Sequence, residues 1–460
     1  MKDLDCVVKN GTVVTAAATF AADIGIRGET IAAIGLGLEG DQILDAAGLY
    51  VLPGFVDSHV HLQMTVGDMR TADDFASGTI AAACGGTTTI VDFTSNLRGD
   101  DLARGAVLRR READNHVAVD YNLHLTLADA SDATMAALPL LAREGYASAK
   151  LYTTYDGLRL DDHEILTLLE ATSRCGILPL VHAENHAAIQ YLTADLLRQG
   201  KTAPEYHPLS RPPEVEAEAA HRVLALAGLV KAPVFIAHLT CRQTLEAVRM
   251  ARGRGQQVYA ETCPHYLLLS DRLYKQEGFQ AAKVVLSPPL RAEENCEILW
   301  TALRQGELQS VSTDHCPWNY ASQKVRGRDS FARIPNGAPG IETRMPLLLH
   351  EAFNNRRLPL ERLVEVCSTA PARLHGLYPV KGTIAVGSDA DLVFFDPHRP
   401  VTLSQATLHQ DVDYCPFEGT TVQGYPSTVM LRGQIIVRDG KYVGHAGQGR
   451  FVPAQPFRYA

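Results

Sequence analysis

The chain has 460 residues, more than one ordinary domain requires, and this length suits a barrel of about 250 residues with an accessory domain. Hydrophobic residues make up 46% of it and the formal net charge is −9, without the basic, aromatic-interleaved patches that favour nucleic acid as a partner. No run approaches the ~20 apolar residues of a membrane span, and residues 1–8 carry charges where a signal peptide is apolar. Nine cysteines without a C-x-x-C pair indicate a reducing compartment, so we expect a cytoplasmic protein with no membrane partner.

Short strands separated by glycine-containing turns are predicted at both ends of the chain. Asn10-Gly11, Arg27-Gly28-Glu29 and Arg432-Gly433-Gln434 each separate two alternating apolar runs, a pattern typical of hairpins. The predicted strands are residues 5–8, 12–15, 23–26, 30–34, 391–396, 427–431 and 435–438. Because neither end alone has enough strands for a stable sheet, we expect one small β-sandwich domain assembled from residues 1–52 and 381–460.

Residues 53–380 alternate strand-length apolar runs with longer stretches of helix-like spacing. The eight runs are residues 54–61, 87–93, 120–127, 147–152, 178–182, 234–238, 257–261 and 309–314. Eight buried parallel strands that alternate with helices are what a closed barrel requires, so we predict an α/β fold with a (β/α)₈ TIM barrel. A doubly wound open sheet is the alternative, but no glycine-rich phosphate loop follows the first run.

Residues with metal-binding chemistry stand where several of these strands end. In such a barrel, side chains at the carboxyl ends of the strands face the active site. The first strand ends in His59-Val60-His61, and the alternation of strand side chains directs both imidazoles to one side. His182 and His238 end the fifth and sixth strands, and Asp314 ends the eighth. A lone histidine is more often a core residue and an aspartate can cap a helix, but together these residues favour a metal site.

Lys150 stands inside the apolar fourth strand, where an unpaired ammonium group is costly. An ion pair with a neighbouring carboxylate is one explanation. In the second explanation, nearby divalent ions keep the amine neutral, because the ammonium form has no lone pair with which to bind a metal. The neutral amine adds carbon dioxide and becomes a carbamate, a short anion suited to bridging two metals. The predicted ligands are therefore His59, His61, Lys150, His182, His238 and Asp314. Zinc suits them best, with manganese, cobalt or nickel possible, and a hydroxide between two such ions is a nucleophile near neutral pH.

With these residues in place, the chain resembles the D-hydantoinases and dihydropyrimidinases, the cyclic amidases of the amidohydrolase superfamily. The resemblance extends over essentially the whole chain and also rests on residues 81–93, 181–185, 260–266, 312–316, 334–340 and 381–391. The Pro-Asn-Gly-Ala-Pro-Gly run at residues 335–340 is the most specific of these. The resemblance implies hydrolytic opening of cyclic ureides or imides, such as 5-monosubstituted hydantoins and 5,6-dihydropyrimidines, to N-carbamoyl amino acids.

The resemblance also implies a role for individual residues. One metal ion would take His59, His61 and Asp314, the other His182 and His238, and carbamylated Lys150 would bridge them. Asp314 would accept a proton from the bridging hydroxide and pass it to the leaving ring nitrogen. Tyr155 matches the tyrosine that hydrogen-bonds the oxygen developing charge, although from the residues alone a rim aromatic is the simpler interpretation. Ser287 and Asn336 match positions that hold the amide and imide groups of the ring, largely through backbone atoms.

The sequence departs from the family pattern after His61, where Leu62 to Met69 replaces the usual loop. In this family the loops after strands one and four form the pocket for the substituent on ring carbon 5. Met64, Val66 and Tyr152 are therefore predicted to line that pocket, and the resemblance leaves substituent preference and handedness open. The polar stretch of residues 320–333 is predicted to be a solvated loop over the mouth of the site.

Two other functions stay open at this point. An allantoinase or another imidase would share the fold and the metals, but allantoinases do not carry the tyrosine that Tyr155 matches. A non-enzymatic structural relative of dihydropyrimidinase would have lost metal ligands, whereas all six candidates are present here. The expected partners are a small cyclic amide, two divalent metal ions, carbon dioxide for Lys150, and copies of this chain, since family members are usually homotetramers, with a homodimer as the alternative.

Overall fold

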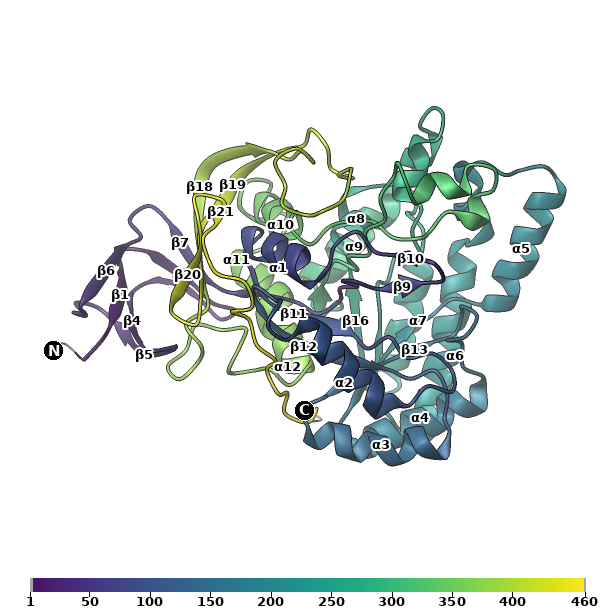
Figure 1. Cartoon of the computed structure of the whole chain (residues 1–460), viewed down its shortest axis with the longest axis horizontal. Helices are drawn as coiled ribbons and strands as arrows, with labels where there is room; N and C mark the ends of the chain where they lie inside the picture. The colour runs from purple at the N-terminus through teal and green to yellow at the C-terminus, as the bar shows by residue number, and fades with distance from the viewer. Residues whose placement is uncertain (1–2, 459–460) are drawn as a thin grey trace.

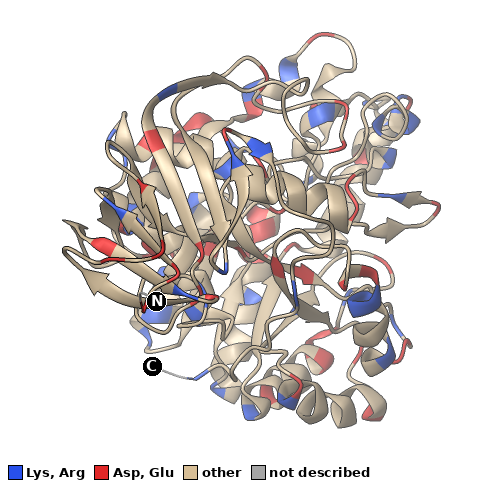
Figure 2. Ribbon diagram, turned by 60° about the vertical axis from the view of Figure 1, so that its left-hand side comes forward, with Lys and Arg blue, Asp and Glu red and all other residues tan. Residues whose placement is uncertain are grey.

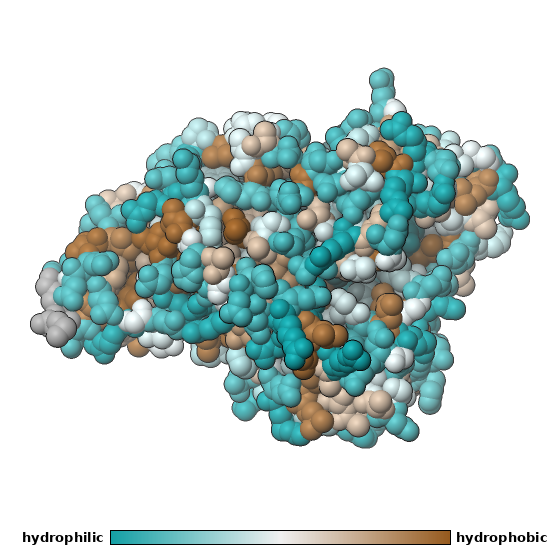
Figure 3. Space-filling model, in the orientation of Figure 1, coloured by the Kyte–Doolittle hydropathy of each residue, from teal (hydrophilic) through white to brown (hydrophobic). Residues whose placement is uncertain are grey.

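The computed structural model describes residues 3–458. Figure 1 shows a barrel surrounded by helices on one side and a β-rich part that carries the N-terminal strands on the other. Basic and acidic residues are interspersed in Figure 2. The face in Figure 3 is largely hydrophilic, with apolar residues gathered over the N-terminal strands. No helix within residues 3–458 combines the length and the apolar character that crossing a bilayer requires.

Eight parallel strands form the barrel, and each pairs with the next along the chain. They are β8 (Phe55–Asp57), β11 (Thr87–Phe93), β12 (Asp120–Thr126), β13 (Ser148–Tyr152), β14 (Leu178–His182), β15 (Val234–Ile236), β16 (Val258–Thr262) and β17 (Ser310–Val311). The first and last strands meet just beyond their ends, where the backbone N–H of His61 donates to the carbonyl of His315 at 2.8 Å. The predicted TIM barrel is confirmed, and every residue of β11 to β14 is buried, the polar ones included.

Helices cover the outside of the barrel. They are α1 (Phe75–Cys84), α2 (Leu102–Ala113), α3 (Asp132–Arg143), α4 (Asp162–Cys175), α5 (His186–Arg198), α6 (Pro213–Val230), α7 (Arg242–Gly253), α8 (Pro264–Leu268), α9 (Glu293–Arg304), α10 (Arg344–Phe353), α11 (Leu360–Val364) and α12 (Ala370–Leu374). Several begin at residues suited to a helix start: Asp74 and Asp161 cap α1 and α4 with reciprocal capping boxes, and Pro213 opens α6.

Two further sheets are built from the ends of the chain. The first has the order β5 (Thr30–Gly35), β4 (Asp23–Arg27), β1 (Cys6–Lys9), β6 (Gln42–Asp45). The second has the order β21 (Lys441–Tyr442), β20 (Gln434–Arg438), β19 (Thr421–Leu431), β18 (Leu392–Thr402), β7 (Tyr50–Pro53), β2 (Thr12–Val14), β3 (Thr19–Ala21). Val8 and Ile24 of the first sheet share an apolar core with Val51, Leu392 and Met430 of the second, so the predicted β-sandwich from both chain ends is confirmed.

One predicted hairpin is wrong. The hairpins at residues 23–34 and 427–438 are present, but residues 5–8 and 12–15 belong to different sheets. β1 pairs with β4 and β6, whereas β2 pairs with β3 and β7. Asn10 takes a left-handed backbone conformation, with φ of 62°, and moves the chain from one sheet to the other. The turn signal was correct, but it does not determine which strand becomes the partner.

A buried ionic cluster attaches the β-sandwich to the barrel. Lys381 Nζ contacts Asp120 at the start of β12, and it lies 2.8 Å from Asp389 and 3.0 Å from Asp391. Arg432, in the turn between β19 and β20, also contacts Asp120. Both Lys381 and Asp120 are fully buried, so their charges are compensated by partners within the protein and not by water.

We expect Lys381→Met to destabilise the protein by about 3–5 kcal/mol, because it leaves buried carboxylates without their shared cation. Urea unfolding followed by circular dichroism measures this. Lys9→Met is the matched control: Lys9 pairs with Glu39, whose side chain is 64% exposed, and such a pair contributes about 0–1 kcal/mol. Equal stability of the two variants would show that the cluster does not hold the two parts together.

Candidate metal centre

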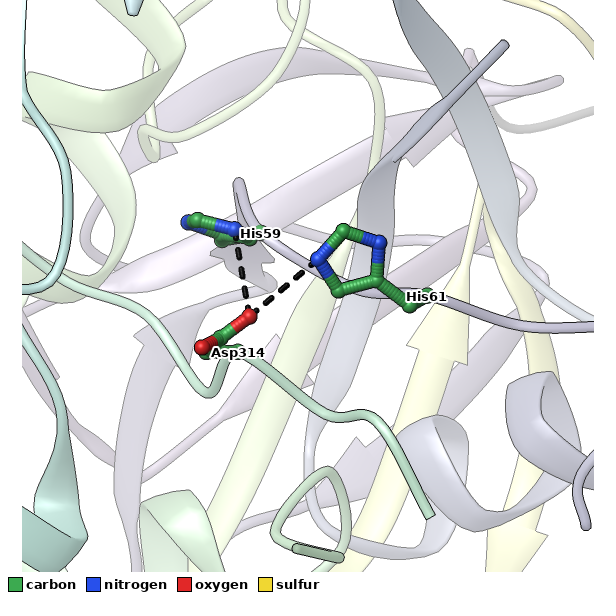
Figure 4. Close-up of side chains that lie close together, drawn as sticks. All are labelled: His59, His61 and Asp314. Atoms are coloured by element: carbon green, nitrogen blue, oxygen red, sulfur yellow. Dashed lines mark ion pairs between the residues drawn. The ribbon is translucent and has the colours of Figure 1, made fainter. Parts of the chain in front are cut away.

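Three of the predicted ligands converge at the carboxyl end of the barrel (Figure 4). Asp314 Oδ1 lies 3.2 Å from His59 Nε2 and 3.2 Å from His61 Nε2. His59 and His61 follow β8 with one residue between them, and their ring centroids are 5.3 Å apart. These nitrogen and oxygen atoms lie within 4.8 Å of one another, so a single ion could contact all three.

The other three predicted ligands extend this group into one continuous cluster. Lys150 Nζ, from β13, lies 3.2 Å from His59 Nε2. The ring of His238 is centred 5.5 Å from that of His59 and 4.5 Å from that of His182. His59, Lys150, His182 and His238 are all buried. The barrel therefore brings all six residues together from five strand ends.

Two of these residues, and Tyr155 near them, have a backbone conformation that is uncommon for residues other than glycine. The φ angle is 35° at His238, 48° at Asp314 and 76° at Tyr155. Non-glycine residues in this region are strained and gather at functional sites, where the surrounding structure fixes them. All three lie just beyond barrel strands, on the rim that carries the cluster.

Two buried glutamates stand behind the imidazoles, and the sequence interpretation gave neither a role. Glu261 Oε1 is 2.5 Å from His59 Nδ1, and Glu184 Oε2 is 2.7 Å from His182 Nε2. Each carboxylate fixes its ring and leaves the other ring nitrogen for a metal, as is usual around ligating histidines. Glu184 is itself held by Arg211 at 2.7 Å. Their position at the ends of β16 and β14 was the signal that could have identified them.

The environment of Lys150 makes the neutral amine easier to reach than it is for an exposed lysine. Burial lowers the pKa of Lys150 to about 8, with Asp314 and Glu261 opposing the shift. Within residues 3–458 no carboxylate lies at ion-pair distance from Nζ, which is instead 5.1 Å from the centre of the Phe93 ring. The ion pair that was one explanation for this lysine is therefore absent from the described part of the chain. A neutral amine is the form that can add carbon dioxide.

The histidines are also in the form that binds metals. Burial lowers the pKa of His182 and holds the pKa values of His59 and His238 well below the ordinary value, so their lone pairs are free at neutral pH. His238 Nδ1 is buried without a hydrogen-bond partner in the part of the chain described. Neutral nitrogen together with carboxylate oxygen is the donor set that zinc and similar divalent ions take. The residues therefore fit the metals that the sequence implies.

The predicted substrate residues lie next to this cluster. The ring of Tyr155 is centred 5.0 Å from that of His182, and Ser287 is near enough to oppose the effect of burial on its pKa. Asn336 Nδ2 donates to Ser287 Oγ at 2.9 Å. Burial raises the pKa of Tyr155, so its hydroxyl keeps the proton that a hydrogen-bond donor needs. Tyr155 and the hydrogen-bonded pair of Ser287 and Asn336 thus lie at the edge of the six candidate ligands.

The residues predicted for the substituent pocket are more dispersed. Tyr152 is buried, and its ring is centred 6.0 Å from that of Tyr155. Met64 is half-buried and Val66 is 49% exposed. Val66 lies on a short hairpin of β9 (Thr65–Val66) and β10 (Met69–Arg70) that follows the first barrel strand. Their contact with a substituent stays a prediction.

The interpretation of residues 320–333 as a solvated loop is wrong in part. The segment contains two short 3₁₀ turns, η5 (Lys324–Gly327) and η6 (Phe331–Arg333). Arg326, Arg328 and Arg333 are exposed as expected, but Lys324 and Phe331 are buried. A polar composition averages over the segment and does not reveal one lysine that turns inward.

A second group of ligand-type side chains lies away from the barrel mouth, where Cys84, Glu342 and His409 meet. Both carboxylate oxygens of Glu342 accept hydrogen bonds from His409, one from the backbone N–H at 2.6 Å and one from Nδ1 at 2.8 Å. Burial raises the pKa of the Cys84 thiol, which therefore stays protonated. This group is a closed ion pair that attaches the C-terminal segment to the barrel.

Comparison with known proteins agrees with this geometry. Residues 50–436 match the model of the Amidohydrolase family. The chain is 44% identical to the D-hydantoinase of Ralstonia pickettii, over 99% of this chain and 100% of that protein, and 44% identical to the D-hydantoinase of Rhizobium radiobacter, over 97% and 98%. The crystal structure of dihydropyrimidinase from Brevibacillus agri has a TM-score of 0.97 at 43% identity and covers 99% of each chain. This chain therefore belongs to the amidohydrolase family, within the group of D-hydantoinases and dihydropyrimidinases.

Proposed function

We propose that this protein opens cyclic ureides and imides, with 5-monosubstituted hydantoins and 5,6-dihydropyrimidines as substrates and N-carbamoyl amino acids as products. The observation that carries the proposal is that Tyr155 lies beside His182 and next to Ser287, which accepts a hydrogen bond from Asn336. It sets a hydroxyl donor and amide-binding groups at the edge of a cluster suited to metals. Relatives named D-hydantoinase, at 44% identity over nearly the full length, support the same activity.

The residues of the cluster fit two divalent metal ions, with zinc preferred. His59, His61 and Asp314 would hold one ion, His182 and His238 the other, and carbamylated Lys150 would contact both. When bound, two such ions supply Lewis-acid activation of the amide carbonyl and an acidified water as nucleophile. Glu261 and Glu184 orient the imidazoles through the ring nitrogens that face away from the ions.

The side chains then have separate tasks in amide hydrolysis. Asp314 accepts the proton of the attacking water and delivers it to the leaving ring nitrogen, because its carboxylate lies at the centre of the cluster. The Tyr155 hydroxyl donates to the carbonyl oxygen as negative charge develops on it. Ser287 and Asn336 hold the amide and imide groups of the ring, so that the scissile carbonyl faces Asp314.

The two other functions are less well supported. An allantoinase would not need Tyr155, whose ring lies beside His182. A non-enzymatic relative would not need six residues with ligand chemistry and two glutamates that orient two of them. The full-length relatives named D-hydantoinase also favour the ring-opening activity over both.

The test is to purify the protein with zinc or manganese and bicarbonate, and to measure metal content and ring opening together. We expect about two metal ions per chain and turnover of hydantoin, of 5-substituted hydantoins tested as both enantiomers, or of dihydrouracil. Allantoin belongs in the same panel, as does protein stripped by a chelator. A metal-loaded protein that opens none of the hydantoins or dihydropyrimidines would refute the proposal, and turnover of allantoin alone would favour the alternative.

A further inference from the structure

Lys324 connects the two backbone segments that carry the proposed ring-binding residues. Its side chain is fully buried, and Nζ donates to the carbonyl of Val285 at 3.0 Å and to that of Pro335 at 3.1 Å. Val285 lies two residues before Ser287, and Pro335 lies directly before Asn336. Lys324 therefore holds together the two segments that the Ser287–Asn336 hydrogen bond also joins.

The residues on either side of Lys324 hold a different structure, the β9–β10 hairpin. Gln323 Nε2 donates to the carbonyl of Arg70 at 2.6 Å. Arg326 makes a two-pronged contact with Asp68 at the hairpin turn, at 3.3 and 2.6 Å. The hairpin consists of two strands of two residues each, and a two-stranded ribbon of this size is marginally stable alone. Its position therefore depends on contacts such as these.

We propose that the η5 turn positions both halves of the substrate site, with Lys324 fixing the segments that bind the ring and Gln323 and Arg326 fixing the hairpin that carries Val66. This inference rests on the proposed function. None of the three side chains is assigned a contact with substrate, so they are positioning residues. The turn thus keeps the segments that bind the ring at a fixed position relative to the hairpin that contacts the substituent.

The two faces of the turn have different consequences. Without the Lys324 amino group, two buried carbonyls lose their donor, and the segments carrying Ser287 and Asn336 relax. Every cyclic substrate uses those segments, whatever its substituent. The hairpin contacts are exposed and involve neither Ser287 nor Asn336, so loosening them alters only the space available to a substituent on ring carbon 5.

The test compares two substrates in three variants loaded with metal. The substrates are hydantoin, which has no substituent, and 5-phenylhydantoin. The variants are Lys324→Met, the double variant Gln323→Ala with Arg326→Ala, and Arg333→Met as control. Arg333 lies in the same stretch of chain, is exposed, and pairs with Asp329 on the surface. For each variant kcat, KM and metal content are measured.

We expect Lys324→Met to raise KM at least about tenfold for both substrates, with metal content unchanged. The double variant should change KM for 5-phenylhydantoin by about fivefold or more and leave KM for hydantoin within about twofold. Arg333→Met should change neither value. A fold that is merely less stable lowers the active fraction, and therefore kcat, without raising KM.

Unchanged KM in Lys324→Met would overturn the inference, as would an equal loss on both substrates in the double variant. Should Lys324→Met fail to fold, the surface double variant decides by its selectivity between the two substrates. Lys324→Arg, which keeps hydrogen-bond donors at the same place, should recover part of the lost affinity. Failure of the proposed function is distinguishable, because the unaltered, metal-loaded protein would then open neither ring.

Discussion

Lys150→Ala is expected to lose at least one of two bound metal ions and to lower kcat/KM for ring opening by about a thousandfold or more. Without a shared carbamate, two dications would depend on four imidazoles and the single carboxylate of Asp314, which would leave their charge poorly compensated. A loss of several kcal/mol of transition-state stabilisation corresponds to this factor, since each 1.36 kcal/mol is tenfold. Metal content by elemental analysis and turnover on one hydantoin measure both effects.

Rescue and a matched control make this experiment specific. A short carboxylate such as formate or propionate, added with metal, should restore part of the activity of Lys150→Ala, because it can take the place of the carbamate. It should have no effect on Lys275→Ala, in which an exposed lysine outside the cluster is removed. In the unaltered protein, reconstitution with metal should be slower in buffer freed of carbon dioxide. Full activity with two metals in Lys150→Ala would show that no carbamate is needed.

The barrel and the ligand positions were accessible from the sequence because both depend on local periodicity. A buried parallel strand is a continuous apolar run, and its carboxyl end faces the site whatever the loops do. His59, His182 and Asp314 therefore met in space although they are far apart in the chain. The resemblance supplied the tasks of these residues, which periodicity does not provide.

The errors arose where a distant part of the chain decides the outcome. Asn10-Gly11 was a correct turn signal, but packing of β1 against β4 and β6 decided the pairing. Glu261 had no visible role, because its partner His59 is 202 residues away. Lys324 looked like a solvated charge, because the carbonyls that receive it belong to segments 39 and 11 residues away. Local patterns do not contain such contacts.

Tyr155→Phe tests the residue that gives the metal cluster its substrate class. We expect kcat to fall by about 10²–10³-fold, the usual effect of removing one donor to a developing oxyanion. Metal content should stay unchanged, since Tyr155 is next to the ligand His182 without being one of the six candidates. Because burial raises the pKa of Tyr155, the hydroxyl stays protonated through neutral and mildly alkaline pH. Removing this hydroxyl should therefore lower kcat by the same factor at every pH in that range, without moving the pH optimum.

Tyr191→Phe is the matched control for that experiment. Tyr191 lies in α5, is 70% exposed, and loses the same hydroxyl group on substitution. If only Tyr155→Phe lowers kcat, the effect belongs to the Tyr155 hydroxyl beside His182. If Tyr155→Phe instead releases metal, Tyr155 supports the ligand His182, and the assignment to cyclic ureides then depends on the full-length D-hydantoinase relatives alone. Measuring kcat and metal content on the same sample separates these two roles, because a transition-state donor changes the first without the second.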